Sequence, residues 1–213
     1  REFEKNKNLF FVTRKGVVKK SELTLFNNIM KAGKRAIKLN DEDEVMFVGL
    51  TSGSGKDEIF VATRNGIAIR FSEKNVRSMG TIAAGVKGIT LRDKDKIIGA
   101  AIINSEIDDT EIKILTITEE GYGKCTKLSE YRLTSRGGKG ILNAKLNEKT
   151  GQIIDVKVVG KDDEIMLITS EGTLIRTRVD SISTFGRYSS GVKIMKVRNS
   201  EKIVSTVKIT ETS

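Results

Sequence analysis

Short apolar runs of four to seven residues alternate with polar, glycine-containing stretches along the whole chain. The runs are rich in Ile, Val, Thr and Phe and are bounded by Gly, Asn, Asp and Ser, which is the pattern of β-strands joined by tight turns. No segment keeps a helical period over three turns. Several runs are continuously apolar, so we expect strands that are covered on both faces.

A four-residue pattern, Thr-x-x-Gly, follows four of these runs at a near-constant spacing. The runs are "LFFV", "IFVA", "ILTI" and "MLIT", and the glycines are Gly16, Gly66, Gly121 and Gly172. The glycines lie 50, 55 and 51 residues apart, a period typical of repeat arrays. Because glycine tolerates a positive φ without steric cost, we predict a structural hairpin turn at each one.

Each unit contains a second glycine and a closing apolar run. The second glycines, 17 to 19 residues after the first, are Gly33, Gly85, Gly140 and Gly191, and the closing runs are "VMFVGL", "IIGAAII", "IIDVKVV" and "IVSTVKI". We divide the chain into repeats over approximately 9–57, 58–111, 112–163 and 164–213. Roughly four strands per repeat predict an all-β, propeller-like array of four-stranded blades, with a β-solenoid as the alternative.

The composition excludes several kinds of catalytic and metal site. The chain has no histidine and one cysteine, so it holds no His/Cys metal cluster and no Ser-His-Asp or Cys-His nucleophile. We expect no catalytic residue, metal ion, cofactor or small-molecule substrate in this chain. A single cysteine forms no internal disulfide, and no apolar run approaches membrane-spanning length, so we expect a cytoplasmic protein that binds no membrane.

The charge balance favours a polyanionic partner. The 38 basic and 28 acidic residues give a net charge of +10, which favours nucleic acid or an anionic membrane. Membrane binding would require a basic amphipathic helix, and none is predicted. Aromatic residues make up only 5% of the chain, so we expect contacts to phosphates instead of base stacking.

Basic residues recur at equivalent positions of the repeats. The fourth residue after the hairpin glycine is basic in three repeats and is Cys125 in the remaining one. The candidate DNA-binding residues are Lys19, Lys20, Lys34, Arg35, Arg70, Lys87, Lys124, Lys127, Arg136, Lys139, Arg176, Arg178, Arg187 and Lys193. In a radial array these positions form a basic band around the rim, which positions DNA without reading its sequence. The alternative is an ordinary scatter of solvated charges.

Two glycine-rich stretches, "SGSGKDE" (52–58) and "LTSRGGKGI" (133–141), superficially resemble nucleotide-binding loops. A Walker loop requires Ser or Thr after its lysine, but Lys56 is followed by Asp57 and Lys139 by Gly140. We therefore interpret 52–58 as a linker between blades rather than part of a nucleotide-hydrolysing enzyme. We interpret 133–141 as an exposed blade-edge loop in which Arg136 and Lys139 contact phosphate.

The repeats and three motifs resemble a known family over essentially the whole chain. "AAGVKGITL" (83–91), "EEGYGK" (119–124) and "SRGGKG" (135–140) are similar to the C-terminal domain of bacterial DNA gyrase A. The resemblance implies a β-pinwheel, usually of six blades that exchange strands, which wraps double-stranded DNA on its basic rim. It also implies an A2B2 enzyme of gyrase A and gyrase B, associated with the nucleoid, which uses ATP and Mg elsewhere to introduce negative supercoils.

The box motif of that family is only partly matched here. The family sequence is Gln-(Lys/Arg)-Arg-Gly-Gly-(Lys/Arg)-Gly in the first blade, whereas this chain has Thr134 and Ser135 at its first two positions and carries the motif in its third repeat. The box-like residues are Ser135, Arg136, Gly137, Gly138, Lys139 and Gly140. We expect the chain to hold the last four blades, with the full box and the catalytic tyrosine upstream.

Two further expectations follow from the resemblance. Tyr122, Tyr131 and Tyr188 are not expected to act as nucleophiles, and Cys125 is expected to weaken the basic rim in its repeat. The equivalent domain of topoisomerase IV is the alternative within this class. A protein-scaffold propeller is the alternative from a different class, and it would expose apolar anchors on one face.

Overall fold

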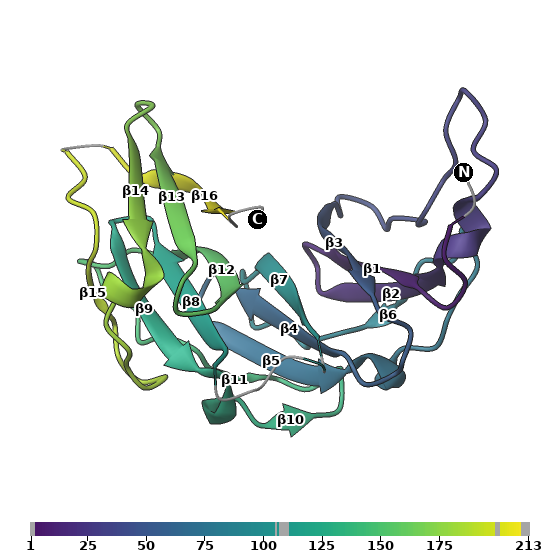
Figure 1. Ribbon diagram of the computed structural model, residues 1–213, viewed down its shortest axis with the longest axis horizontal. Helices are drawn as coiled ribbons and strands as arrows, with labels where there is room; N and C mark the ends of the chain where they lie inside the picture. The colour runs from purple at the N-terminus through teal and green to yellow at the C-terminus, as the bar shows by residue number, and fades with distance from the viewer. Residues whose placement is uncertain (1–2, 105, 107–110, 199–200, 210–213) are drawn as a thin grey trace. The chain divides into compact units, whose positions relative to one another are not determined.

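The computed structural model of the chain describes residues 3–104, 106, 111–198 and 201–209 (Figure 1). In these residues the secondary structure consists of β-strands and short 3-10 turns, so the prediction of an all-β fold is confirmed. The 3-10 turns are η1 (Leu23–Phe26), η2 (Glu73–Asn75), η3 (Leu128–Glu130) and η4 (Val179–Ser181). Among the described residues no helix is long and apolar enough to cross a membrane.

The strands form four small sheets, one built around the hairpin of each repeat. The first has the order β3 (Val45–Thr51), β1 (Asn8–Thr13), β2 (Val17–Glu22), β6 (Val86–Lys87). The second is β10 (Leu133–Thr134), β5 (Ile67–Ser72), β4 (Glu58–Thr63), β7 (Ile97–Ile103), with β11 (Ile141–Leu142) also paired to β5. The third is β12 (Ile153–Val159), β8 (Lys113–Thr118), β9 (Tyr122–Lys127), β15 (Val192–Lys193), and the fourth is β14 (Leu174–Arg178), β13 (Glu164–Thr169), β16 (Ile203–Ile209).

The outer strand of a sheet is donated by the next repeat. β6 follows the second glycine of the second repeat, yet it pairs antiparallel with β2 of the first. β15 of the fourth repeat pairs in the same way with β9 of the third. β5 of the second repeat receives β10 in parallel and β11 in antiparallel orientation, both from the third. Successive repeats are therefore linked by main-chain hydrogen bonds as well as by side-chain packing.

The fourth sheet departs from the expected four strands per blade. It contains three strands in the described part of the chain. The reason is the strand exchange, because the fourth strand of a blade belongs to the following repeat. No described residue follows the fourth repeat to supply one.

The four hairpins share one turn geometry. Gly16, Gly66, Gly121 and Gly172 have φ values of +80°, +90°, +82° and +82°. Each glycine N–H donates to the carbonyl of the threonine three residues earlier, at 3.0 to 3.2 Å. The same threonine accepts, through its side-chain oxygen, the N–H of the residue after the glycine, as in Val17 N–H to Thr13 Oγ1 at 3.1 Å. This second bond explains why threonine recurs in the motif.

The inner strands are covered on both faces. β4 and β8 are buried at every position except the first, which accounts for their continuous apolar runs. β14, in contrast, alternates between exposed and half-buried positions. The core between the third and fourth sheets includes Leu115, Ile117, Ile165, Leu167 and Ile203. The ring centroids of Phe10, in the first repeat, and Phe71, in the second, are 6.4 Å apart.

The chain divides into two compact units. Unit 1 comprises Arg1–Val61, Ile69–Glu106 and Leu133–Gly140, and unit 2 comprises Ala62–Ala68, Ile107–Arg132 and Ile141–Ser213. Unit 1 contains the first sheet, and unit 2 contains the third and fourth sheets. Because the repeats exchange strands, two residues that contact each other can belong to different repeats and still lie in the same unit, as Leu133 and Arg70 do.

Candidate nucleic-acid interface

The segments around the second glycine of each repeat carry half of the candidate basic residues. We call them the glycine loops, and they run to the second residue after that glycine, over 27–35, 77–87, 132–142 and 183–193. Their glycines Gly33, Gly85, Gly140 and Gly191 all have a positive φ. Three of the loops start alongside the hairpin of the preceding repeat, through the parallel bridge Lys20–Ser78, the β10–β5 pair and the parallel bridge Cys125–Thr184.

Two of the predicted DNA-binding lysines are buried and hold glycine loops in place. The Lys19 ammonium donates to the carbonyls of Ala36, at 2.5 Å, and Thr81, at 2.8 Å. Lys124, at the equivalent position of the third repeat, donates to the carbonyls of Gly186 and Arg187 at 2.8 and 3.1 Å. Both side chains are at most 1% exposed. Burial rules out phosphate contact by either lysine in this conformation, which corrects the sequence-based interpretation.

Burial also makes these lysines easier to deprotonate. Desolvation lowers the pKa of Lys19, and it lowers the pKa of Lys124 to about 8. The nearby carboxylate of Glu130 raises the pKa of Lys124, whereas the guanidinium of Arg187 lowers it further. The hydrogen bonds to carbonyl oxygens remain possible for a neutral amine, because it still carries N–H donors.

The two arginines four residues before a second glycine join consecutive loops. Arg136 Nη1 donates to the carbonyl of Lys87 at 2.9 Å, and its Nε donates to the carbonyl of Asn75 at 2.8 Å. Arg187 Nη1 donates in the same way to the carbonyl of Leu142 at 3.0 Å. Lys87 and Leu142 both stand two residues after the second glycine of the preceding repeat. These half-buried arginines therefore connect loops. The N–H groups left for an external acceptor do not include Arg187 Nε, which is buried.

The backbone of the box-like loop is bonded to the second repeat. Gly137 N–H donates to the carbonyl of Gly88 at 2.6 Å, and Thr90 N–H donates to the carbonyl of Gly138 at 2.8 Å. Ser135, Gly138 and Lys139 are exposed. The loop is thus an exposed blade-edge segment, as its sequence predicts, and Lys139 points its charge to solvent.

The basic residues four positions after the hairpin glycine are ion-paired. Lys20 lies 3.7 Å from Glu73 Oε2, and Arg70 and Arg176 pair with Glu58 and Glu164, respectively. Arg70 is buried. Their charge is therefore partly neutralised by carboxylates, so this position does not form the free basic band that the sequence suggested. Arg178, although exposed, is also paired, with Asp180 at 2.8 Å.

Cys125 does not leave a gap in the basic surface. Its side chain is completely buried, and burial raises the pKa of its thiol to about 11. The expectation that Cys125 weakens the rim is therefore wrong, because this position does not reach the surface. Tyr131, one of the tyrosines not expected to act as a nucleophile, is also buried and donates its hydroxyl to Asn143.

Six candidate cations are exposed and have no ion-pair partner among the described residues. They are Lys34, Arg35, Lys87, Lys127, Lys139 and Lys193. Lys34 donates to the carbonyl of Leu25 at 2.5 Å, and the Lys193 ammonium lies 5.1 Å from the Tyr122 ring centroid, but neither contact removes the charge. Five of these cations lie within two residues of a second glycine. We call these six residues the free cation set.

The sequence analysis missed two cations with a recurring position. Arg77 and Arg132 are exposed, and both lie eight residues before the second glycine of their repeat. Counting backwards from that glycine would have found them. They follow the buried residues Val76 and Tyr131, which end the 3-10 turns η2 and η3.

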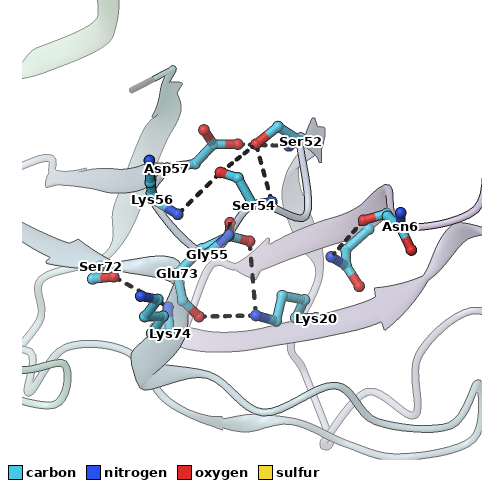
Figure 2. Close-up of polar contacts among 11 residues, drawn as sticks. Asn6, Lys20, Ser52, Ser54, Gly55, Lys56, Asp57, Ser72, Glu73 and Lys74 are labelled. Carbon is cyan, nitrogen blue, oxygen red and sulfur yellow. Dashed lines mark hydrogen bonds and ion pairs between the residues drawn. The ribbon is translucent and has the colours of Figure 1, made fainter. Parts of the chain in front are cut away.

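Four amides of the loop 52–58 are bonded within the chain, two of them to carboxylates. Gly55 N–H donates to Glu73 Oε1 at 2.8 Å, and Ser52 N–H donates to Asp57 Oδ2 at 2.6 Å. Figure 2 shows Glu73 between Gly55 and Lys20, so that a carboxylate of the chain itself occupies the position of an anion. A phosphate would have to displace this carboxylate, which supports the linker interpretation over nucleotide binding.

Comparison with known proteins identifies the family. The family described as "DNA gyrase C-terminal domain, beta-propeller" matches residues 7–52, 57–104, 113–160 and 163–210. The A subunit of DNA gyrase from Staphylococcus epidermidis is 41% identical over 203 residues, which cover 95% of this chain and 22% of that protein. Its counterpart from Ureaplasma parvum is 40% identical over 197 residues, covering 92% of this chain and 23% of that protein. The chain thus spans less than a quarter of the length of these relatives.

Solved structures show the same fold. The C-terminal domain of a DNA topoisomerase IV superimposes with a TM-score of 0.90 at 31% identity, over 98% of this chain and 64% of that one. A DNA gyrase A C-terminal domain superimposes with a TM-score of 0.85 at 27% identity, over 98% of this chain and 68% of that one. The four matched segments of the family model cover most of the chain. This chain therefore belongs to the DNA gyrase A C-terminal domain family.

Proposed function

We propose that the chain binds duplex DNA without sequence preference and wraps it along the glycine loops, as part of a gyrase A protein. The observation that carries the proposal is the free cation set, most of which recurs beside the second glycine in successive repeats. Lysine and arginine contacts of this kind fix the path of a phosphate backbone but do not read bases. Membership of the DNA gyrase A family supports the same function.

The rest of the enzyme enters this proposal through the family. We infer that the chain works with the remainder of gyrase A and with gyrase B in an A2B2 assembly in the bacterial cytoplasm, close to the nucleoid. It needs no cofactor of its own, since ATP and Mg act elsewhere in that assembly. The bound DNA segment is presented to the cleavage centre, and the hand of the wrap sets the sign of supercoiling.

The topoisomerase IV domain is the second candidate, because its structure superimposes with a TM-score of 0.90. The identity of 41% and 40% to two gyrase A proteins over almost the whole chain favours gyrase.

The first experiment measures affinity for a labelled duplex as salt is raised from about 50 to about 200 mM. If roughly six or more phosphates are contacted, affinity should fall on the order of a thousandfold, with equal slopes for unrelated sequences. A weak salt dependence, or strong preference for one sequence, would contradict the proposal. It would instead favour the protein-scaffold propeller.

The second experiment tests wrapping. A nicked circular plasmid is ligated in the presence of the chain, and its topoisomers are separated on a gel. Because this chain matches the box motif only in part, it should bind the plasmid without shifting the linking number in one direction. A one-directional shift as protein is added would contradict this expectation and would mean that the chain itself sets the hand of the wrap.

A further inference from the structure

Three glycine loops present a large apolar side chain to solvent at the same position. The position lies three residues before the second glycine and is occupied by Met30, Ile82 and Tyr188. These side chains are 81%, 74% and 71% exposed, the highest values for large hydrophobic residues in the described part of the chain. In the box-like loop the same position is Gly137.

The exposed position lies on a fixed turn. Gly33 N–H donates to the carbonyl of Met30 at 2.8 Å, and the turn around Ile82 is closed by Ala83 N–H to the carbonyl of Gly80 at 3.2 Å. In the fourth repeat, Ser189 N–H donates to the carbonyl of Gly186 at 3.1 Å, which holds Tyr188 at the turn. Lys19 and Lys124 bond the loops of the second and fourth repeats to buried strands. A side chain on such a turn projects with little additional loss of conformational freedom on binding.

Single exposed apolar residues are ordinary on protein surfaces. A large apolar residue at the same loop position in three of four repeats is not an ordinary scatter. Each occurs among basic residues of its own loop: Met30 with Lys31, Lys34 and Arg35, Ile82 with Lys87, and Tyr188 with Arg187. The guanidinium carbon of Arg187 lies 5.3 Å from the Tyr188 ring centroid.

This pattern distinguishes DNA from a protein partner. The centre of a protein–protein interface is depleted of charge and combines several apolar residues into one patch. Here the apolar residue three positions before the second glycine lies among cations in each of the three loops, and the first loop adds a second exposed apolar side chain, Ile29. Proteins that bend DNA use that arrangement, with cations on the phosphates and an apolar side chain inserted at a base step in the minor groove.

We propose that Met30, Ile82 and Tyr188 insert into the minor groove and partly unstack base steps where the DNA bends around the glycine loops. This inference rests on the proposed DNA-binding function and adds a mode of contact to it. Unstacking makes a bend easier, and the bend brings more phosphates within reach of the free cation set. Gly137 gives the box-like loop no such side chain, so the backbone there can approach the DNA closely.

The test uses a duplex with 2-aminopurine at several positions, because its fluorescence rises when the base is unstacked. The parent chain should raise the fluorescence on binding. The triple variant Met30→Ser, Ile82→Ser, Tyr188→Ser should lose most of this rise and bind on the order of tenfold more weakly. Its salt slope should also become shallower, because without the bend fewer phosphates lie within reach of the free cation set.

The matched control is the double variant Leu174→Ser, Val204→Ser. These side chains are 52% and 57% exposed but lie on strands β14 and β16, outside the glycine loops. The control should keep both the fluorescence rise and the affinity of the parent. Melting curves of all variants check that each one folds.

The outcomes separate the inference from the function on which it rests. If the parent binds with steep salt dependence and the triple variant matches it in fluorescence and affinity, the insertion inference is wrong and the proposed function stands. The exposed side chains of Met30, Ile82 and Tyr188 would then be available to a protein partner. If the parent itself does not bind duplex DNA, the proposed function fails, and the insertion inference fails with it.

Discussion

The side chain of Arg136 is hydrogen-bonded to the backbone carbonyl of Lys87, with 2.9 Å between Nη1 and the oxygen. Arg187 and Leu142 repeat this relationship one repeat later, at 3.0 Å. A basic residue of the box-like motif thus joins two consecutive glycine loops. Its neighbour Lys139 is exposed and has no ion-pair partner in the described residues. The two cations of one motif have different structural surroundings, so their removal should have different effects.

Replacing Arg136 should mainly affect stability. Arg136→Ala removes two hydrogen bonds from a charged donor to backbone carbonyls, which should lower the free energy of unfolding by about 1 to 2 kcal/mol. Lys139→Ala should leave that free energy unchanged, weaken DNA binding by about 1 kcal/mol or less and reduce the salt slope by about one charge. Urea denaturation and binding titrations at several salt concentrations measure both effects. If Arg136→Ala lowers the salt slope without affecting stability, the arginine contacts phosphate directly.

The hairpin glycines Gly66 and Gly172 form a matched pair for testing close packing. Both have a positive φ, so Gly→Ala at either position strains the backbone by roughly 1 to 3 kcal/mol. At Gly66 the added Cβ would also lie 2.6 Å from the carbonyl oxygen of Ala144, whereas at Gly172 it meets no described atom within 4 Å. Gly66→Ala should therefore be the more destabilising change, by about 1 to 3 kcal/mol beyond Gly172→Ala. Equal melting temperatures would show that the third repeat does not pack over the Gly66 hairpin.

The repeat pattern predicted the fold because each signal was local. Thr-x-x-Gly requires only a hairpin, and continuous apolar runs such as "IFVA" require only burial on both faces. Which repeat a short strand joins depends on tertiary pairing, so β10 and β11, in the third repeat, gave no local sign that they pair with β5 of the second. The three strands of the fourth sheet were not predicted for the same reason, because pairing between repeats decides which strands a sheet contains.

The charged positions were harder to interpret, because charge in a sequence does not show the direction of a side chain. Lys19 and Lys124 recur at one position of the repeat, and recurrence of charge alone favours a surface site. The equivalent residues of the other two repeats, Ile69 and Ile175, are apolar, and this indicates an inward-facing position. Comparing that position across all four repeats would have assigned both lysines to the interior.

The buried Lys124 makes stability depend on pH. Its pKa is lowered to about 8 in the folded chain, while an unfolded lysine titrates near about 10.4. Between these two values the unfolded chain binds a proton that the folded chain has lost, so the contribution of Lys124 to stability rises with pH in this window. The gain should be on the order of 1 to 3 kcal/mol, since one pKa unit corresponds to about 1.4 kcal/mol.

Other buried groups change stability with pH in the opposite direction. The prediction therefore concerns the difference in the free energy of unfolding between the parent and a variant that lacks Lys124. Burial raises the pKa of the Cys125 thiol to about 11 and also raises the pKa of Tyr131, and both contributions to stability fall as pH rises through the unfolded values. Comparing the parent with Lys124→Met cancels these contributions. The free energy of unfolding of the parent, relative to that variant, should increase between about pH 8 and about pH 10. The exposed control Lys127→Met should show no such trend. A parent-minus-variant difference that stays constant over this range would mean that the buried ammonium keeps its proton.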